Sequence, residues 1–253
     1  DMYSEIIRSA ARLIREANYA IALTGAGIST PSGIPDFRTP NSGLWEVANP
    51  VEVASIFGFK RQPQAFYHWI RPLARTMLLA QPNPAHLALA QLEQAGYIKS
   101  VITQNIDMLH TKAGSREVYE VHGQLRQATC IQCFRVYEAG PIITTFLEDG
   151  QVPHCPACGG VLKPNVILFG EQLPVRELFA SQQAARRCDV MLVAGSSLEV
   201  SPAGDLPLLA HRQGAHLIIV NREPTHIDAL ADVISRDDVA EVLPQIAAVV
   251  MEE

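Results

Sequence analysis

The stretch TGAGISTPSGIPDFR, residues 24–38, follows an apolar run at 19–23 that predicts a buried strand. Gly25 and Gly27 come directly after this strand, and glycines at such a point allow a tight turn in which the backbone approaches a ligand closely. Turns of this kind present backbone N–H groups to phosphates. The spacing differs from the dinucleotide fingerprint G-x-G-x-x-G, because Thr30 occupies the third glycine position. The turn by itself therefore indicates either a nucleotide site or an ordinary strand-to-helix connection.

The second half of the stretch, GIPDFR at 33–38, cannot be regular helix. Pro35 fixes its own φ and biases Ile34 toward extended geometry. The loop places a carboxylate, an aromatic ring and a guanidinium beside the glycine turn, which is typical of ligand contact. Together with GAGIS at 25–29, this segment resembles the signature of the sirtuins, the Sir2-type NAD-dependent protein deacylases. For the cofactor, the resemblance implies contacts from Gly25, Ala26, Gly27, Ser29, Asp36, Phe37 and Arg38.

The composition is that of a globular protein with a sizeable core, since 48% of the 253 residues are hydrophobic and 18% are charged. We expect no membrane segment, because no apolar run approaches the ~18 residues that a spanning helix needs. The start of the chain does not predict a signal peptide. A net charge of -6 argues against direct nucleic-acid binding, although a basic protein segment could still be a partner. We therefore predict a cytoplasmic protein.

Predicted strands at 19–23, 98–102, 190–194 and 217–220 alternate with helical patterns. This alternation predicts an α/β fold with a Rossmann-like, doubly wound parallel sheet. Two segments interrupt the sheet pattern. The first has a helical pattern that several prolines, Pro72 among them, are expected to break, and we expect its aromatic residues in the core. The second holds two Cys-x-x-Cys pairs. The predicted division is an NAD-binding domain at 1–38, 81–123 and 164–253, a helical module at 39–80 and a structural zinc module at 124–163.

The run TQNID at 103–107 follows a predicted strand directly, where parallel sheets bind ligands. Asn105 and Asp107 alternate, so in extended backbone they project to the same side. Asp107 could instead only cap the helix that follows. The run resembles a sirtuin motif residue for residue, which implies that Gln104 contacts the nicotinamide ribose, that Asn105 and Asp107 line the nicotinamide pocket and act in catalysis, and that Ile106 belongs to the same cofactor site.

His122 follows a predicted strand at 118–121 and precedes a glycine. An imidazole titrates near neutrality and can act as a general base, although a histidine is more often structural. The catalytic base of sirtuins occupies this His-Gly position, so the resemblance implies that His122 is the base and contacts the substrate. His110 is the second candidate, with a structural role as its first interpretation.

Two Cys-x-x-Cys pairs, 21 residues apart between the inner cysteines, are the strongest purely chemical signal in the chain. Four thiolates at this spacing suit tetrahedral zinc, and a site closed by four protein ligands is structural. A pair of redox dithiols is the alternative. The predicted zinc ligands are Cys130, Cys133, Cys155 and Cys158.

Further segments carry the sirtuin resemblance toward the end of the chain. The family usually has Gly-Thr-Ser where this sequence has GSS at 195–197, so Ser196 keeps the hydroxyl group. For the cofactor, the resemblance implies additional contacts from Gly195, Ser196, Ser197, Asn221, Asp238 and Val239. For an extended substrate peptide, it implies contacts from Phe37, His122, Val166, Phe169, Gly170, Glu171, Leu198 and Val200.

The activity implied by the resemblance is NAD-dependent lysine deacetylation of proteins, which yields nicotinamide, free lysine and O-acetyl-ADP-ribose. Sirtuins that prefer dicarboxylic acyl groups have Tyr-x-x-Arg in the acyl pocket, whereas here Ile70 stands in place of that arginine and Arg71 is one residue late. We therefore expect acetyl or longer apolar acyl groups. Protein ADP-ribosylation and an inactive binding module are the alternatives. The expected partners are acetylated proteins, bound by a monomer.

Overall fold

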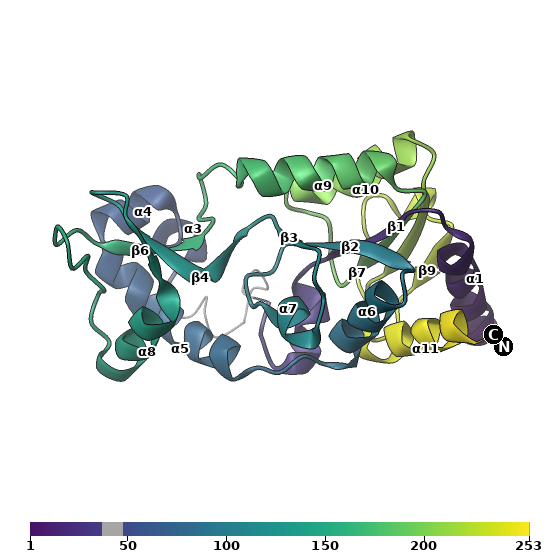
Figure 1. The fold of residues 1–253 in the computed structure, drawn as a ribbon, viewed down its shortest axis with the longest axis horizontal. Helices are drawn as coiled ribbons and strands as arrows, with labels where there is room; N and C mark the ends of the chain where they lie inside the picture. Colours follow the sequence, from purple (N-terminus) through teal and green to yellow (C-terminus); the bar gives the residue numbers. More distant parts are fainter. Residues whose placement is uncertain (37–47, 253) are drawn as a thin grey trace.

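The larger lobe is built on a six-stranded sheet, on the right in Figure 1. The computed structural model describes residues 1–36 and 48–252. All neighbouring strands of this sheet are parallel, in the order β3-β2-β1-β7-β8-β9. Counted along the chain within this sheet, the order is 3-2-1-4-5-6, as in Rossmann folds, so the predicted doubly wound sheet is confirmed. The strands are β1 Ala20–Thr24, β2 Ile98–Thr103, β3 Val118–Glu120, β7 Val190–Ala194, β8 His216–Val220 and β9 Val233–Ser235.

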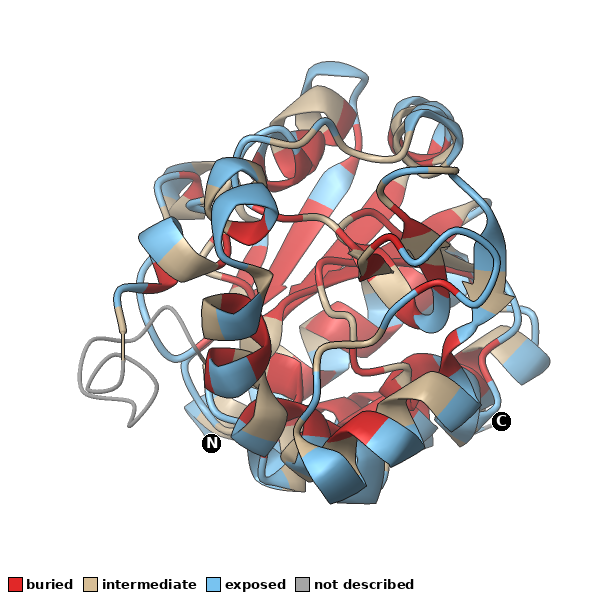
Figure 2. Ribbon diagram, turned by 90° about the vertical axis from the view of Figure 1, so that its left-hand side faces the viewer, coloured by how far each residue is buried: buried red, intermediate tan, exposed pale blue. Residues whose placement is uncertain are grey.

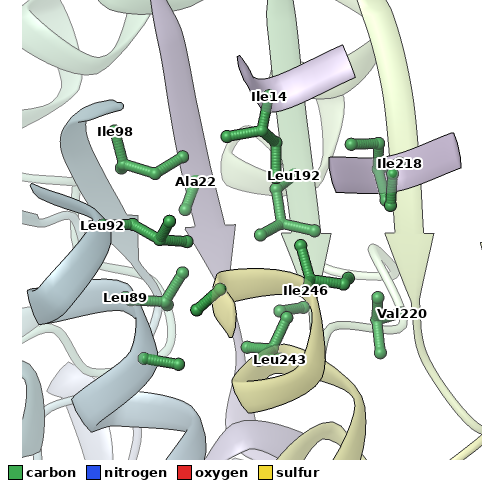
Figure 3. Close-up of a cluster of buried hydrophobic side chains, with 14 of the residues drawn as sticks. Ile14, Ala22, Leu89, Leu92, Ile98, Leu192, Ile218, Val220, Leu243 and Ile246 are labelled. Carbon is green, nitrogen blue, oxygen red and sulfur yellow. The ribbon is translucent and has the colours of Figure 1, made fainter. Parts of the chain in front are cut away.

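Helices cover both faces of the sheet, because its strands are apolar on both sides. In β1, Ala20 and Ala22 pack into one cluster, and Ile21 and Leu23 into the other. The first cluster, shown in Figure 3, is closed by α1 Met2–Glu16, α6 Pro84–Gln94 and α11 Val239–Met251. The second is closed by α9 Val175–Arg187 and α10 Leu206–Arg212. Among the described helices, none is long and apolar enough to cross a membrane.

The smaller lobe combines the helical segment with the cysteine-bearing segment, on the left in Figure 1. Its antiparallel sheet has the order β5-β4-β6. The two segments share one hydrophobic cluster, in which Phe66 and Trp69 of α5 join Leu125 of β4 and Phe146 of α8. The elements are α3 Pro50–Val53, α4 Ile56–Arg61, α5 Pro63–Leu79, β4 Gly123–Cys130, β5 Val136–Glu138, α8 Ala139–Asp149 and β6 Leu162–Val166.

Two expectations about the helical segment were wrong. Pro72 does not break a helix but lies inside α5, on its exposed side, where water can satisfy the carbonyl that the proline leaves unbonded. Phe57 was expected in the core with the other aromatic residues, and 76% of its surface is exposed. Trp45, also expected in the core, lies outside the described residues.

Short elements connect the sheet to the site. They are the 3-10 helices η1 Ala26–Ile28 and η2 Thr30–Ser32 after β1, α7 Leu109–Ala113 after β2, η3 Ala203–Asp205 before α10 and η4 Asp228–Leu230 before β9. Viewed from the end of the smaller lobe, Figure 2 shows buried strands at the centre of the molecule, with more exposed helices and loops around them.

Candidate active site

The turn after β1 and the turn after β7 interlock where the strand order reverses. The Gly27 N–H donates to the Gly195 carbonyl over 2.8 Å. A Cβ on Gly27 would lie 2.9 Å from the Gly195 Cα, and a Cβ on Gly195, whose φ is +67°, would lie 2.2 Å from the Ile28 nitrogen. A Cβ on Gly25 would meet the Ser196 side chain at 2.9 Å. Only glycine allows these two turns to pack together, and they do so at the position where Rossmann folds bind ligands.

Gln104 lies between the two turns, directly after β2. Its backbone N–H donates to the Thr24 carbonyl over 3.0 Å, and its Oε1 accepts a hydrogen bond from the Ser196 hydroxyl at 2.6 Å. Its Nε2 is buried and has no hydrogen-bond partner in the described part of the chain. An unsatisfied buried donor costs about 1–3 kcal/mol, so this amide is suited to complete its bonding with a ligand acceptor.

Asn105 and Asp107 meet in one hydrogen-bond network around Ser29. Asn105 Nδ2 donates to the Gly25 carbonyl over 2.9 Å and to Ser29 Oγ over 3.3 Å. The Ser29 hydroxyl donates to Asp107 Oδ2 over 2.5 Å. Asp107 Oδ1 accepts the Leu109 N–H at 3.0 Å, so the carboxylate also bonds the first N–H of α7, although Met108 is the N-cap residue. Because both Nδ2 hydrogens of Asn105 are engaged by the protein, its amide oxygen is the group that remains for a ligand.

Burial and hydrogen bonding have opposite effects on the pKa of Asp107. Burial raises the pKa of this carboxyl above its usual range, while the hydrogen bonds from Ser29 and Leu109 and the charge of Lys112 lower it. A carboxylate held in this way stays tightly bound to its donors and presents negative charge to a poorly solvated site.

Two buried histidines stand behind this network. His86 Nδ1 accepts the Asn83 N–H at 3.1 Å, which places the ring proton on Nε2, 3.3 Å from Ser29 Oγ. His110 Nε2 lies 2.7 Å from Thr24 Oγ1. The two rings meet edge to face with centroids 5.0 Å apart. Burial lowers the pKa of His86 to about 4 and, together with His86, lowers the pKa of His110 to about 3, so both rings are neutral at working pH.

His122 occupies the connection between the two lobes. Its Nδ1 lies 3.0 Å from the Gln104 carbonyl oxygen. A carbonyl only accepts, so Nδ1 carries the proton and Nε2 is the basic nitrogen of the neutral ring. The His122 carbonyl accepts the Ile167 N–H at 2.8 Å, and Gly123 pairs with Val166, so the histidine is fixed beside β6.

A single cavity of about 290 Å³ connects these groups. Its polar end is lined by Ser29, Gln104, Asn105, Asp107 and His122. Its other end is apolar and is lined mainly by the smaller lobe. The apolar lining includes Ile34, Pro35, Ala54, Phe66, Trp69, Ile70, Leu73, Met77, Val166 and Leu168. A ligand could therefore bind by hydrogen bonds at the polar end of the cavity and place an apolar chain in its apolar end.

The loop after β6 forms one rim of the cavity. Glu171 Oε1 accepts the Leu168 N–H at 2.9 Å and pairs with Lys163 Nζ at 3.2 Å. The Ile56 N–H donates to the Phe169 carbonyl over 3.0 Å, which ties this loop to α4. The loop is thus held by the Glu171 contacts on one side and by the hydrogen bond from Ile56 on the other.

The four predicted metal ligands lie together at the far end of the smaller lobe. Their Sγ atoms are all within 4.8 Å of one another. Cys130 and Cys158 approach to 3.4 Å, and Cys133 and Cys155 to 3.7 Å. Tetrahedral zinc with bonds of about 2.3 Å separates its sulfurs by about 3.8 Å, so the four thiols fit zinc. His154 donates no ligand atom to this cluster, since its Nδ1 pairs with the Gly159 carbonyl oxygen at 3.0 Å.

The sequence matches the Sir2 family over residues 25–202. It is 48% identical to the NAD-dependent protein deacylase 2 of Archaeoglobus fulgidus over 241 residues, which cover 95% of this chain and 94% of that protein. The chain belongs to the Sir2 family. Among solved structures, a Sir2 enzyme superposes with a TM-score of 0.91 at 47% identity, covering 98% of both chains. Sir2Af2 bound to a myristoylated histone peptide superposes with a TM-score of 0.84 at 43% identity, covering 98% of this chain and 97% of that one.

Much of the predicted Sir2 site lies in one place. The predicted residues that line the cavity are Ala26, Ser29, Gln104, Asn105, Ile106, Asp107, His122, Val166, Phe169, Gly170, Glu171 and Val200. Gly25, Gly27, Gly195 and Ser196 form the interlocked turns beside it. Phe37 and Arg38 lie outside the described residues.

Other predicted residues are placed away from the cavity lining. Leu198 is only 2% exposed and packs into the core, and its N–H donates to Ser196 Oγ over 3.2 Å. Asn221 donates to the Glu223 carbonyl over 2.9 Å, and Asp238 caps α11 through the Ala240 N–H. Asp36, Ser197 and Val239 are likewise outside the cavity lining among the described residues.

By resemblance, the sequence indicated an acyl pocket at Ile70, and it also named His110 as a candidate. It did not predict that the rest of the apolar stripe of α5 lines the cavity, or that His86 lies behind the polar end. The signal for the arm was present, because Phe66, Trp69, Ile70, Leu73 and Met77 recur at helical spacing along α5. Such a stripe is indistinguishable from one that faces a closed core. His86 carried no comparable signal, since its role depends on contacts between α6 and the turn after β1.

Proposed function

We propose that this chain is an NAD-dependent protein lysine deacylase. It would transfer an acyl group from lysine to ADP-ribose and release nicotinamide, free lysine and O-acyl-ADP-ribose. The observation that carries the proposal is the cavity, in which the polar groups of the sheet edge and His122 share one space with an apolar arm. Similarity to a relative named as an NAD-dependent protein deacylase, over nearly the whole of both chains, gives independent support.

The residues present fit NAD. The interlocked glycine turns lie at the sheet edge where Rossmann folds bind ligands, and the unpartnered Nε2 of Gln104 is suited to a ribose oxygen. When bound, NAD supplies the bond to nicotinamide that is broken and the ribose hydroxyl that takes the acyl group. From the sequence resemblance we also propose contacts to NAD from Asp36, Phe37, Arg38, Ser197, Asn221, Asp238 and Val239.

Asn105 and Asp107 are the proposed nicotinamide site. A carboxamide offers an acceptor and two donors, and the two side chains provide a complementary carboxylate and amide within one fixed network. Positive charge develops at the ribose carbon as nicotinamide leaves. A negative group preorganised in a poorly solvated site stabilises such charge more than water does.

His122 is the proposed general base. Because its Nδ1–H is directed at the Gln104 carbonyl, Nε2 is the nitrogen that would take a proton from a ribose hydroxyl. This contact with the Gln104 carbonyl orients the imidazole ring of His122.

The apolar arm indicates which acyl groups are accepted. Ile70 lines it, while the Arg71 guanidinium is held outside by the carbonyls of Leu147 and Glu148. A dicarboxylic acyl group would therefore leave its carboxylate unpaired in an apolar space, at a large cost. We propose acetyl or longer apolar groups, and the arm's extension along α5 to Met77 specifically favours longer chains as a second substrate class.

The substrate would be an acyl-lysine in an extended segment, held between the loop at 166–171 and the segment at 198–200. Pairing with backbone at such edges tolerates varied sequences. We also propose that the protein is a cytoplasmic monomer that does not bind nucleic acid directly. The net charge of -6 and the clustering of four cysteines as thiols support these proposals, and cell fractionation and light scattering test them.

The decisive experiment measures nicotinamide release from NAD with an acetyl-lysine peptide. The wild type, His122→Ala and His68→Ala are compared; His68 is an exposed residue of α5 that does not line the cavity. We expect peptide-dependent release and deacetylation from the wild type and His68→Ala, and loss of deacetylation in His122→Ala. Release that does not need the acyl group would instead establish NAD hydrolysis or ADP-ribosyl transfer. NAD binding without any release would leave a binding module and contradict the proposal.

A further inference from the structure

A second hydrogen-bond chain reaches Asn105 from behind, independently of Ser29. The Asn105 N–H donates to Thr103 Oγ1 over 3.1 Å. The Thr24 hydroxyl donates to the same oxygen over 2.9 Å, and His110 Nε2 lies 2.7 Å from Thr24 Oγ1. Thr24 and Thr103 are paired across β1 and β2 at the carboxyl ends of these strands, so the chain runs along the edge that forms the floor of the site.

The unpartnered nitrogen of His110 orders the donors of this chain. His110 Nδ1 is buried and has no hydrogen-bond partner among the described residues, and an unbonded lone pair is tolerated there better than an unbonded N–H would be. The ring proton is therefore placed on Nε2, which donates to Thr24 Oγ1. The Thr24 hydroxyl then donates to Thr103 Oγ1, which also accepts the Asn105 N–H.

The ring of His110 is buried and packs against a second histidine. It is 2% exposed, lies in the first turn of α7 and packs edge to face against His86. That neighbour supports the Ser29 hydroxyl, which bonds the side chains of Asn105 and Asp107. One hydrogen-bond chain thus runs from His110 to the backbone of Asn105, and another runs from His86 to its side chain. The two histidine rings are in contact with each other.

We propose that His110 is a positioning residue for the nicotinamide-releasing step, acting through Thr24 and Thr103 on the backbone of Asn105. Asn105 lines the cavity, whereas His110, Thr24 and Thr103 lie behind it. The inference rests on the proposed function and names a residue that the chemistry itself does not touch. Removing the donor on His110 releases the oriented hydroxyl groups and lets the start of the 105–107 segment shift.

The test compares His110→Leu, which removes the donor, with His110→Gln, whose Nε2 can still donate to Thr24. Thr24→Val removes the middle hydroxyl and keeps the side-chain shape. Ser100→Ala is the matched control, because Ser100 is a buried residue of β2 whose hydroxyl has no partner in the described chain. Each variant is checked for its thermal midpoint. At a temperature well below all midpoints, kcat and KM for nicotinamide release and the inhibition constant of added nicotinamide are measured.

We expect His110→Leu and Thr24→Val each to lower kcat by about 10- to 100-fold, the range found for groups that orient a functional side chain. Nicotinamide inhibition should weaken in parallel, KM for the acyl peptide should be unchanged, and His110→Gln should recover most of the rate. The double variant should be no slower than Thr24→Val, because both changes break the same chain.

Three results would each overturn the inference. The first is a His110→Leu protein that is less stable but retains the wild-type kcat and nicotinamide inhibition, which would make the histidine purely structural. The second is an equal loss of kcat in His110→Gln and His110→Leu. The third is strictly multiplicative losses of kcat in the double variant. A wild type that releases no nicotinamide would instead refute the proposed function, so the two failures are distinguishable.

Discussion

The two ends of the cavity are specified in different ways. At the polar end, Ser29, Asn105 and Asp107 bind one another, and each bond needs a particular donor or acceptor. At the apolar end, Phe66 and Trp69 of α5 need only to be hydrophobic and of suitable size. Substitution of a residue at the polar end leaves a buried polar atom without a hydrogen-bond partner. Substitution of an apolar residue of α5 by another of similar volume costs little stability.

This difference separates the chemistry from the choice of substrate. The polar end belongs to the parallel sheet and would break the same bond in NAD whatever acyl group is present. The apolar end is lined mainly by the smaller lobe and, in the proposed function, takes the acyl chain. A protein built in this way can change its acyl preference without disturbing its reaction, and each prediction below tests one side of that division.

The largest effect should come from removing the lobe that carries the apolar end. Cys133→Ser, or zinc chelation, should abolish deacylation and unfold the β5-β4-β6 sheet, because structural zinc contributes about 10 kcal/mol or more to folding. The parallel sheet has its own core and should still bind NAD. Zinc content, circular dichroism and NAD calorimetry check this. His154→Ala, which changes an exposed neighbour of the cluster, should keep zinc and activity. Loss of NAD binding together with zinc would show that the two ends fold as one unit.

The polar end should be nearly as sensitive to a much smaller change. Asp107→Asn keeps the size of the side chain and an acceptor for the Leu109 N–H, but it removes the negative charge that faces the nicotinamide site. We expect kcat for nicotinamide release to fall by about 10²- to 10³-fold, as for loss of one preorganised electrostatic contact. Tight acyl-peptide binding should persist. A variant within a few-fold of the wild type would show that the charge is dispensable and that shape alone holds nicotinamide.

The same division explains what could be predicted from the sequence. The strands at 98–102 and 190–194, the cysteine pairs and the TQNID run were all recognised, because buried strands and hydrogen-bonded ligand sets leave residue-specific patterns. The doubly wound sheet and the cysteine cluster are confirmed. The strand β9 and the helix α8 were not predicted. β9 has only three residues, and α8 lies within the cysteine-bearing segment, so each gives a weak periodic signal.

The extent of the apolar arm beyond Ile70 could not be predicted for a different reason. Leu73 and Met77 face the cavity only because α5 packs against β4, β6 and α8, which are far away in sequence. Hydrophobicity does not encode whether a face meets protein or an empty space. Pro72 was misleading for a related reason, because the burial of neighbouring residues keeps α5 intact around it.

The apolar end can be altered at Ile70, which is partly exposed and lines the arm. Ile70→Arg should slow removal of long acyl chains by about 10- to 100-fold, since each methylene denied burial costs about 0.8 kcal/mol. Acetyl removal should change only a few-fold, and removal of a succinyl group should accelerate. Parallel assays on one peptide with three acyl groups measure this, and Leu79→Arg, an exposed change at the end of α5, is the control. Equal loss for all three acyl groups would contradict the separation of the two ends.

The smallest effect concerns the neutral histidines behind the polar end. The pKa of His110 is about 3 in the folded protein, below its ordinary value of 6.5, so the unfolded chain binds more protons between these values. Stability should therefore decrease as pH falls from 6.5. Asp107, whose pKa is raised by burial, opposes this trend. Between pH 7 and pH 5 the histidine should account for about 2 kcal/mol of lost unfolding free energy.

Urea unfolding at the two pH values isolates this contribution. His110→Gln should reduce the loss by about 2 kcal/mol, since a glutamine does not titrate. Thr24→Val provides the contrast, because it breaks the same hydrogen-bond chain while leaving the imidazole in place, and its pH dependence should follow the wild type. If His110→Gln and Thr24→Val lose stability equally on acidification, the buried imidazole does not oppose protonation, and the polar end owes its rigidity to packing rather than to neutral donors.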